Sequence, residues 1–229
     1  MLEALRAEVF EANLELVRKG LVIYTFGNAS GVSRELGLIV IKPSGVPYGR
    51  MTPADMVVAD LAGNVVEGGL RPSTDLPTHA ALYRAFPSIG GVVHTHSRHA
   101  TAWAQARREI PCFGTTHADY FHGPVPVTEP LSAAEVEGDY EANAGASIVR
   151  RMAGIEPLGC PACLIAGHAP FCWGRGVTEA AYHAVIVEEL AAMAWITLSI
   201  NPAAEPISQA LRDKHYFRKH GPQASYGQK

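Results

Sequence analysis

Hydrophobic residues recur along the chain at two spacings, which predict helices and strands in alternation. A helical spacing over residues 2–19 places Leu5, Val9, Ala12 and Leu16 on one face, and Gly20 would end this helix. The same reasoning predicts helices at 78–86, 97–107, within 133–152, and at 178–198 and 209–219, with Ser97 and Thr178 as N-caps. Runs of β-branched and aromatic residues predict strands at 21–26, 37–42, 56–59, 64–66, 92–96 and 163–166, with a turn at 27–31 and a hairpin joining 56–59 to 64–66.

This alternation of strands and helices indicates one layered α/β domain over residues 1–229. A chain of 229 residues, of which 48% are apolar and 18% charged, is large and apolar enough to bury its own core. The pattern alone does not decide between parallel and antiparallel pairing of the strands.

Charge and cysteine usage narrow the classes of partner. The formal net charge of −3 offers no basic field for nucleic acid or for an anionic membrane. No early apolar run resembles a signal peptide, and the apolar stretch at 190–200 is too short to span a bilayer. Cys160 and Cys163 have the spacing of a redox or zinc pair, but no second pair accompanies them, so they and Cys112 and Cys172 are interpreted as buried thiols. We therefore expect a cytoplasmic protein.

The sharpest chemical signal is the pair of histidines in Val92-Val93-His94-Thr95-His96. Side chains alternate along a strand, so His94 and His96 would point the same way and could share one ion. Two imidazoles on one face of a buried strand each need a partner, which favours a metal over chance surface histidines.

Two loops offer further ligands for such an ion. His168, in Gly167-His168-Ala169-Pro170, follows a short apolar strand, where α/β sheets collect functional side chains. Asp75 follows Ser73 and Thr74 just before a predicted helix, where it could equally be an N-cap. Three imidazoles and a carboxylate suit zinc, although manganese or cobalt could use the same ligands.

Small residues and hydrogen-bond donors gather in two further loops, 27–31 and 42–45. Glycine lets backbone N–H groups approach an anion and Lys42 supplies charge, while Ser73 and Thr74 add hydroxyl donors beside Asp75. Taken singly these are also ordinary turns. The sequence contains neither a Walker A loop nor a dinucleotide-binding glycine fingerprint, which argues against ATP chemistry and against epimerisation through NAD.

Longer blocks around these residues carry a family resemblance. They include Thr25-Phe26-Gly27-Asn28-Ala29-Ser30, residues 40–46, 87–100 and 114–121, Lys214-His215-Tyr216 and Tyr226-Gly227-Gln228. Over nearly its whole length the chain resembles the L-ribulose-5-phosphate 4-epimerases of the class II aldolase/epimerase superfamily. The resemblance implies a three-layer α/β/α domain around a mainly antiparallel sheet. It also implies a homotetramer with active sites at subunit interfaces, to which the tail 220–229 contributes.

The resemblance further assigns roles to individual residues. It implies zinc on Asp75, His94, His96 and His168, and substrate contacts, chiefly to the phosphate, at Asn28, Lys42, Ser44, Gly45, Ser73 and Thr74. Asp119 and Tyr226 of the neighbouring subunit would be the catalytic acid and base, and Thr115, Glu141 and His215 would support substrate binding. Thr74 stands where a second serine is expected and keeps the hydroxyl, and the residues flanking His168 also depart from the family pattern.

The implied reaction is the interconversion of L-ribulose 5-phosphate and D-xylulose 5-phosphate. The hydrogen on C4 of this ketopentose is not acidic, but the C3–C4 bond is β to the carbonyl and can break and re-form, with a zinc ion stabilising the charge. Two alternatives remain at this point. One is a class II aldolase of the fuculose-phosphate type, although related aldolases carry a glutamate where Asp75 stands; the other is a zinc-containing sugar-phosphate binding protein without turnover.

Overall fold

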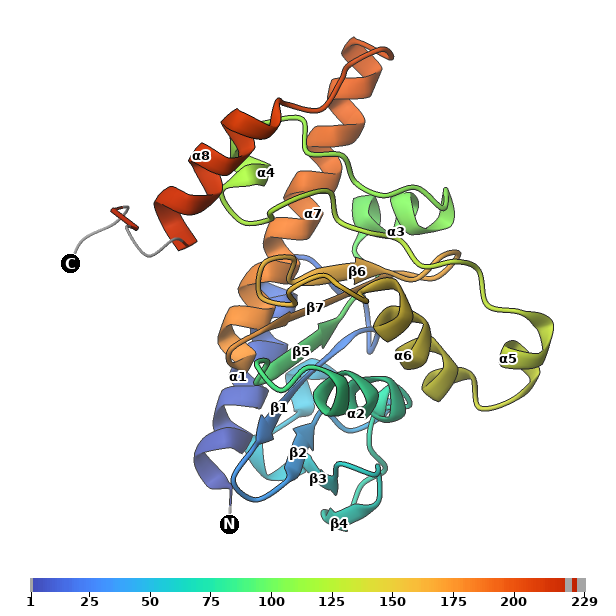
Figure 1. Cartoon of the computed structure of the whole chain (residues 1–229). Coiled ribbons are helices and arrows are strands. Elements are labelled where there is room, and N and C mark those ends of the chain that lie inside the picture. The colour runs from blue at the N-terminus through green and yellow to red at the C-terminus, as the bar shows by residue number, and fades with distance from the viewer. Residues whose placement is uncertain (1, 221–223, 226–229) are drawn as a thin grey trace.

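A computed structural model describes residues 2–220, 224 and 225, and shows one sheet with helices on both sides (Figure 1). The strand order is β4-β3-β2-β1-β5-β7-β6, and every neighbouring pair is antiparallel. The strands are β1 Asn28–Ser33, β2 Leu38–Ile41, β3 Val57–Asp60, β4 Val65–Glu67, β5 Gly91–His94, β6 Ala162–Leu164 and β7 Pro170–Gly174. The expected three-layer α/β/α domain with an antiparallel central sheet is therefore confirmed.

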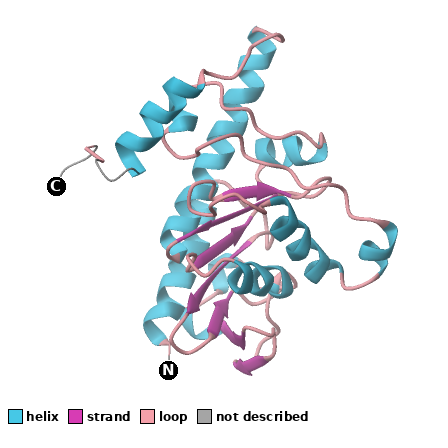
Figure 2. Cartoon of the chain, in the orientation of Figure 1, coloured by secondary structure: helices cyan, strands magenta, loops and turns pink. Residues whose placement is uncertain are grey.

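Helices cover both faces of the sheet (Figure 2). α1 and α7 pack on one face of the sheet, while α2 packs against α6 over the other. The α-helices are α1 Glu3–Arg18, α2 Leu76–Ala85, α3 Arg98–Gln105, α4 Thr115–Ala118, α5 Ala133–Glu137, α6 Tyr140–Arg151, α7 Val177–Ile200 and α8 Gln209–His220, with short 3₁₀ turns at Tyr48–Arg50 and Pro53–Asp55.

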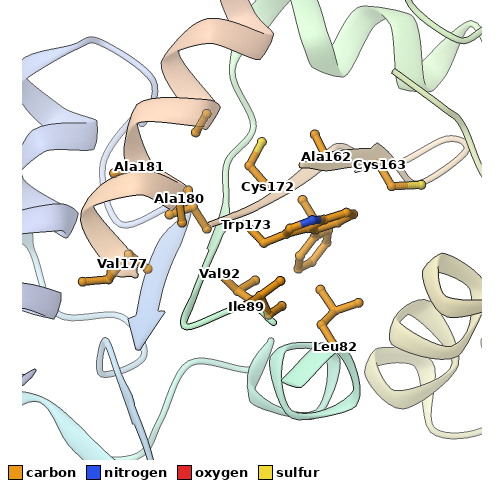
Figure 3. Packing of buried hydrophobic residues seen from close by; sticks show 14 of the residues in the cluster. Leu82, Ile89, Val92, Ala162, Cys163, Cys172, Trp173, Val177, Ala180 and Ala181 are labelled. Carbon is orange, nitrogen blue, oxygen red and sulfur yellow. The ribbon is translucent and has the colours of Figure 1, made fainter. Parts of the chain in front are cut away.

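The central strands and the helices beside them enclose a continuous apolar core, part of which Figure 3 shows. Trp173 of β7 is fully buried there near Leu82, Ile89 and Val92, and its indole N–H donates to the carbonyl oxygen of Pro157 at 2.8 Å. The four cysteines are free and buried, as the sequence predicted.

α7 is long and apolar enough by composition alone to cross a membrane, so the sequence-based view that its apolar run is too short was incomplete. The core helix of a globular fold can have the same length and apolar composition. α7 packs against β5, β7, α1 and α3, and its buried residues extend from Val177 to Ala194.

The largest correction concerns the first strand. Residues 21–26 do not form a strand, because Ile23, Tyr24 and Phe26 are exposed and no strand pairs with them. The predicted turn at 27–31 instead begins β1. Gly31 lets α1 pack closely on this strand, since a Cβ there would lie 2.7 Å from Leu5 Cδ1 and 3.2 Å from Val9 Cγ2.

Three other boundaries differ from the prediction. The helix expected within 133–152 is two helices, because Gly138 ends α5 and the Asp139 side chain accepts from the N–H of Ala142 to begin α6. The sequence did not predict α4 or β7. β7 was missed because it begins at Pro170 and ends at Gly174, and both residue types are more typical of turns. α7 begins at Val177 with Gly176 in the N-cap position, so Thr178, the predicted N-cap, already lies inside the helix.

The start of α3 is capped from another helix. Ser97 occupies the N-cap position, but its side chain makes no capping bond. The carboxylate of Glu188 on α7 accepts the N–H groups of His99 and Ala100 at 2.9–3.1 Å instead.

Candidate active site

Three imidazoles, two from the end of β5 and one from the turn between β6 and β7, converge on one point. His94 is the last residue of β5, His96 follows two residues later beyond the strand, and His168 lies in the turn between β6 and β7. Their ligand nitrogens all lie within 4.8 Å of one another, and Nε2 of His94 is 3.0 Å from Nε2 of His96. The antiparallel pairing of β5 with β7 is what joins the two halves of this triad.

His94 is held so that one nitrogen is left for a ligand. Its Nδ1–H donates to the carbonyl oxygen of Pro170 at 3.0 Å, and its ring stacks on Phe171 with centroids 4.2 Å apart. Burial lowers the pKa of His94 to about 4, and it also lowers the pKa of His96 and His168. The triad is therefore neutral at physiological pH, with lone pairs available for a cation.

The triad fits a divalent metal ion. Two nitrogens bound at 2.0–2.1 Å to a tetrahedral ion lie about 3.4 Å apart, close to the separation found for His94 and His96. Neutral imidazoles are ligands that zinc, cobalt and manganese accept. The three histidines could hold such an ion in the positions that they have here.

Asp75 lies in the same cavity but stands outside the close cluster of the three imidazoles. It occupies the N-cap position of α2 without making a capping bond, and its Oδ2 accepts from the Asn28 amide at 2.6 Å. Burial opposes its ionisation, but attraction to His94 and His79 and the bond from Asn28 outweigh it, so the pKa of Asp75 is lowered. The alternative interpretation of Asp75 as a capping side chain is therefore not supported, and its predicted role as a metal ligand stays a prediction.

The cavity that contains the triad has a volume of about 530 Å³ and a buried cation. Lys42 is only 2% exposed, and its Nζ donates to the carbonyl oxygens of Thr25 and Pro43 at 3.4 and 3.3 Å. Burial lowers the pKa of Lys42 to about 8, and no carboxylate among the described residues pairs with it. A buried ammonium group without a counter-ion favours an anionic ligand.

The other residues expected to contact phosphate line the same cavity. They are Asn28, Ser44, Gly45, Ser73 and Thr74. Tyr140 and Glu141, the first two residues of α6, line it as well. The sequence reasoning missed Tyr140, which no motif distinguishes from its neighbours.

A second polar cluster is separate from this cavity. Asp119 follows α4, and its carboxylate accepts from His215 Nδ1 and from Arg218, both at 3.0 Å, with Lys219 at 3.3 Å. Burial opposes its ionisation, but these hydrogen bonds lower the pKa of Asp119. Neither Asp119, His215 nor Thr115 lines the cavity of the triad.

Tyr226 lies outside the described residues, so its predicted role stays a prediction. The remaining histidines take structural partners within the described chain. Buried His79, for example, contacts the Ser30 hydroxyl through Nδ1 at 2.7 Å.

Comparison with known proteins places this geometry in a family. The chain is 55% identical over 228 residues to the L-ribulose-5-phosphate 4-epimerase UlaF of Salmonella paratyphi C (strain RKS4594), covering 100% of both chains. The protein of the same name from Salmonella choleraesuis (strain SC-B67) has the same identity and coverage.

Solved structures agree on the fold. An L-fuculose 1-phosphate aldolase superposes with a TM-score of 0.78 at 25% identity, covering 93% of this chain and 94% of that one. The L-fuculose-1-phosphate aldolase from Thermus thermophilus gives a TM-score of 0.70 at 25% identity, covering 89% and 100%. The family profile described as "Class II Aldolase and Adducin N-terminal domain" matches residues 7–195. The chain belongs to the class II aldolase and adducin N-terminal domain family.

Proposed function

We propose that the chain is a metal-dependent epimerase that interconverts L-ribulose 5-phosphate and D-xylulose 5-phosphate. The observation that carries this proposal is the convergence of three neutral imidazoles in one cavity with the buried cation of Lys42. The name of the relatives that are 55% identical over the full length supports the choice of substrate and reaction.

The substrate requires a carbon–carbon bond to break. The carbonyl is at C2, so the hydrogen at C4 is too far from it to be acidic, whereas the C3–C4 bond is in the β position. Removal of the proton from the C4 hydroxyl turns C4 into an aldehyde carbon, and the electron pair of C3–C4 passes to the three-carbon fragment. The glycolaldehyde phosphate fragment then presents its other face, C3 adds to it again, and the new C4 oxygen takes up a proton.

We propose that His94, His96 and His168 hold the metal, with Asp75 as the fourth ligand. Zinc is the ion that this donor set suits best, and manganese or cobalt are substitutes. A bound ion would supply Lewis-acid stabilisation of the negative charge that develops on the three-carbon fragment. Asn28 keeps the carboxylate of Asp75 oriented through the 2.6 Å hydrogen bond.

The phosphate end of the substrate belongs at Lys42. The ammonium group would gain the counter-ion that it lacks, and the hydroxyls of Ser44, Ser73 and Thr74 line the same cavity as donors. Gly45 has φ +69° and open space where a Cβ would be, so its backbone can adopt a turn that an anion can approach. A fragment held by its phosphate can turn its aldehyde without leaving.

Proton transfer at C4 is assigned to Asp119 and Tyr226 of a neighbouring subunit in a homotetramer. Each epimer presents its C4 hydroxyl to a different side, which requires two groups. Asp119 does not line the cavity of its own chain, which is what a contribution to the next subunit requires. Thr115, Glu141 and His215 would support the substrate at that junction. The free thiols and the phosphorylated substrate favour a cytoplasmic location.

The second candidate is an aldolase that releases its two fragments, because solved relatives carry the name L-fuculose 1-phosphate aldolase. Both reactions cleave the same kind of bond, and they differ in whether the aldehyde stays bound.

The test supplies L-ribulose 5-phosphate and follows two products. We expect D-xylulose 5-phosphate to form until the epimers reach equilibrium, with no free glycolaldehyde phosphate captured by an aldehyde trap. Accumulation of trapped glycolaldehyde phosphate would establish the aldolase instead, and tight binding of substrate without either product would establish a binding protein.

A further inference from the structure

The hydroxyl of Tyr140 lies against the third imidazole of the triad. Tyr140 is the first residue of α6, and its Oη is 3.2 Å from Nδ1 of His168, with the ring centroids 6.1 Å apart. It also lines the cavity. No part of the function proposed above uses this contact.

An imidazole that binds a metal through one nitrogen needs a partner at the other. That partner fixes the tautomer and the orientation of the ring, and thereby the direction of the remaining lone pair. For His94 the partner is the carbonyl oxygen of Pro170, which accepts from Nδ1 and leaves Nε2 for the ion. For His168 the only protein hydrogen bond found for the ring among the described residues is the one with Tyr140.

His168 needs such a partner more than His94 does. His94 lies in a strand, is 2% exposed and stacks on Phe171, so packing alone restricts its ring. His168 lies in the turn between β6 and β7, next to Gly167, which has φ +75°. The rings of His94, His96 and Phe171 all meet the His168 ring edge-on, at centroid distances of 4.9, 5.0 and 6.5 Å. These contacts restrict the ring less than stacking restricts His94, so a hydrogen bond contributes more to its orientation.

Tyr140 itself is placed by the contact of α6 with α2. The Thr78 hydroxyl on α2 donates to the carbonyl oxygen of Glu141 at 2.6 Å, one residue from Tyr140. Gly145 lets the two helices approach, because a Cβ there would lie 2.7 Å from Ala81 Cβ. The position of the phenol is therefore set by packed helices rather than by a loop.

We propose that Tyr140 is a positioning residue for the metal site: its oxygen accepts the Nδ1–H of His168 and so directs Nε2 of that ring toward the ion. This inference rests on the metal-dependent function proposed above. It concerns the orientation of a ligand and gives Tyr140 no part in proton transfer.

The test compares zinc binding by Tyr140→Phe and the wild-type chain, using competition with a chromophoric chelator. Phenylalanine keeps the ring and removes only the hydrogen-bonding oxygen. We expect the zinc dissociation constant to rise about 10- to 100-fold, the usual cost of losing such a partner. In the cobalt-substituted protein the visible absorption bands should shift, because the geometry around the ion changes. The thermal midpoint of the metal-free form should stay the same, which a general packing role would not allow.

Tyr182→Phe is the matched control. The Tyr182 hydroxyl lies 2.7 Å from that of Tyr120, and Tyr182 does not line the cavity, so its loss should leave zinc affinity unchanged. Equal zinc affinity and equal cobalt spectra in Tyr140→Phe and wild type would overturn this inference while leaving the proposed function intact. Failure of the wild-type chain itself to bind zinc would overturn both.

Discussion

Lys42 and His94 are polar side chains held almost completely out of water, at 2% exposure each. Such burial costs free energy unless a ligand or a hydrogen bond compensates. His94 has one nitrogen bonded and one facing His96. Lys42 contacts two carbonyl oxygens and the face of the Tyr48 ring, and no carboxylate among the described residues pairs with it. Both residues are therefore better satisfied with their proposed ligands than without them.

The charge of Lys42 should make phosphate binding depend on pH. Burial lowers its pKa from 10.5 to about 8, so the ammonium is present below pH 8 and lost above it. The dissociation constant for inorganic phosphate, measured by calorimetry, should therefore rise as pH increases through 8. The free energy of unfolding of the ligand-free chain should change in the other direction from phosphate affinity. Between about pH 8 and 10.5 the unfolded chain keeps the Lys42 proton and the folded chain has lost it, so the contribution of Lys42 makes stability rise with pH in this range.

Lys42→Met is the control for this pH dependence. It should weaken phosphate binding at pH 7 by about 10- to 100-fold, the equivalent of losing a hydrogen bond to a charged group. It should also abolish the change near pH 8. A wild-type profile as flat as that of the variant would contradict the assignment of phosphate to Lys42.

Asp119→Asn should lower turnover by about 10²- to 10⁴-fold, the usual contribution of a general acid or base. The amide keeps the shape of the carboxylate that accepts from His215 and Arg218 but cannot take a proton. Metal content, measured by elemental analysis, should stay at the wild-type level because Asp119 is no ligand. Loss of metal together with turnover would show that Asp119 has a structural role instead.

The sequence predicted the histidines of the site better than it predicted the hydrogen-bond partners around them. The two-residue spacing of His94 and His96 and the turn around His168 indicated a shared ion, and the structure brings the three together. Asp75 could not be separated from a helix cap by sequence alone, because the Asn28 amide that engages it comes from a distant strand. Tyr140 was missed for the same reason: its partner His168 is 28 residues away.

Among the helices and strands, packing overrides local propensity near the N-terminus, where β1 forms. Residues 21–26 have the composition of a strand but no partner strand, whereas the small residues of β1 pair with β2 and β5. Gly31 leaves room for Leu5 and Val9 where α1 crosses β1. The periodicity of a sequence predicts which residues favour a strand. It does not predict how closely a helix will pack on that strand.

The contact between α2 and α6 should be sensitive to one methyl group. Glycine to alanine inside a helix usually stabilises by about 0.5–1 kcal/mol. At position 145 the new Cβ would lie 2.7 Å from Ala81 Cβ and 3.1 Å from Thr78 Cα. We therefore expect Gly145→Ala to lower the free energy of unfolding by about 1–3 kcal/mol, as overpacking does.

Chemical denaturation of Gly145→Ala beside Gly49→Ala provides the comparison. A Cβ on Gly49 would meet nothing within 4 Å, so that variant should be close to neutral. If Gly145→Ala were as stable as wild type, the two helices could move apart freely, and the fixed position of α6 would be wrong.

At the scale of the whole molecule, the two polar clusters are kept apart by the fold. α4 ends just before Asp119 and α8 contains His215. These two helices contact each other near the upper part of α7, away from α2 and α6 (Figure 1). One chain therefore has the metal site and Asp119 on different parts of its surface. A second copy that brings its Asp119 over the cavity would complete the site.

Mixed oligomers should reveal this shared site. His94→Ala lacks a metal ligand and Asp119→Asn lacks the proton-transfer group, so each should be inactive alone. When the two are co-expressed, a site that draws on two subunits, as we propose, would have both residues intact in about one case in four after random assembly. Recovery of about a quarter of wild-type activity is expected, and no recovery in verified hybrids would mean that each site is built from one chain.

Epimerisation at C4, as proposed, depends on a bound metal ion. Activity with L-ribulose 5-phosphate should disappear when the metal is removed by a chelator and dialysis, return on addition of one equivalent of zinc, and fail to return in His94→Ala. Full conversion to D-xylulose 5-phosphate by protein whose metal content has been measured as zero would contradict the account.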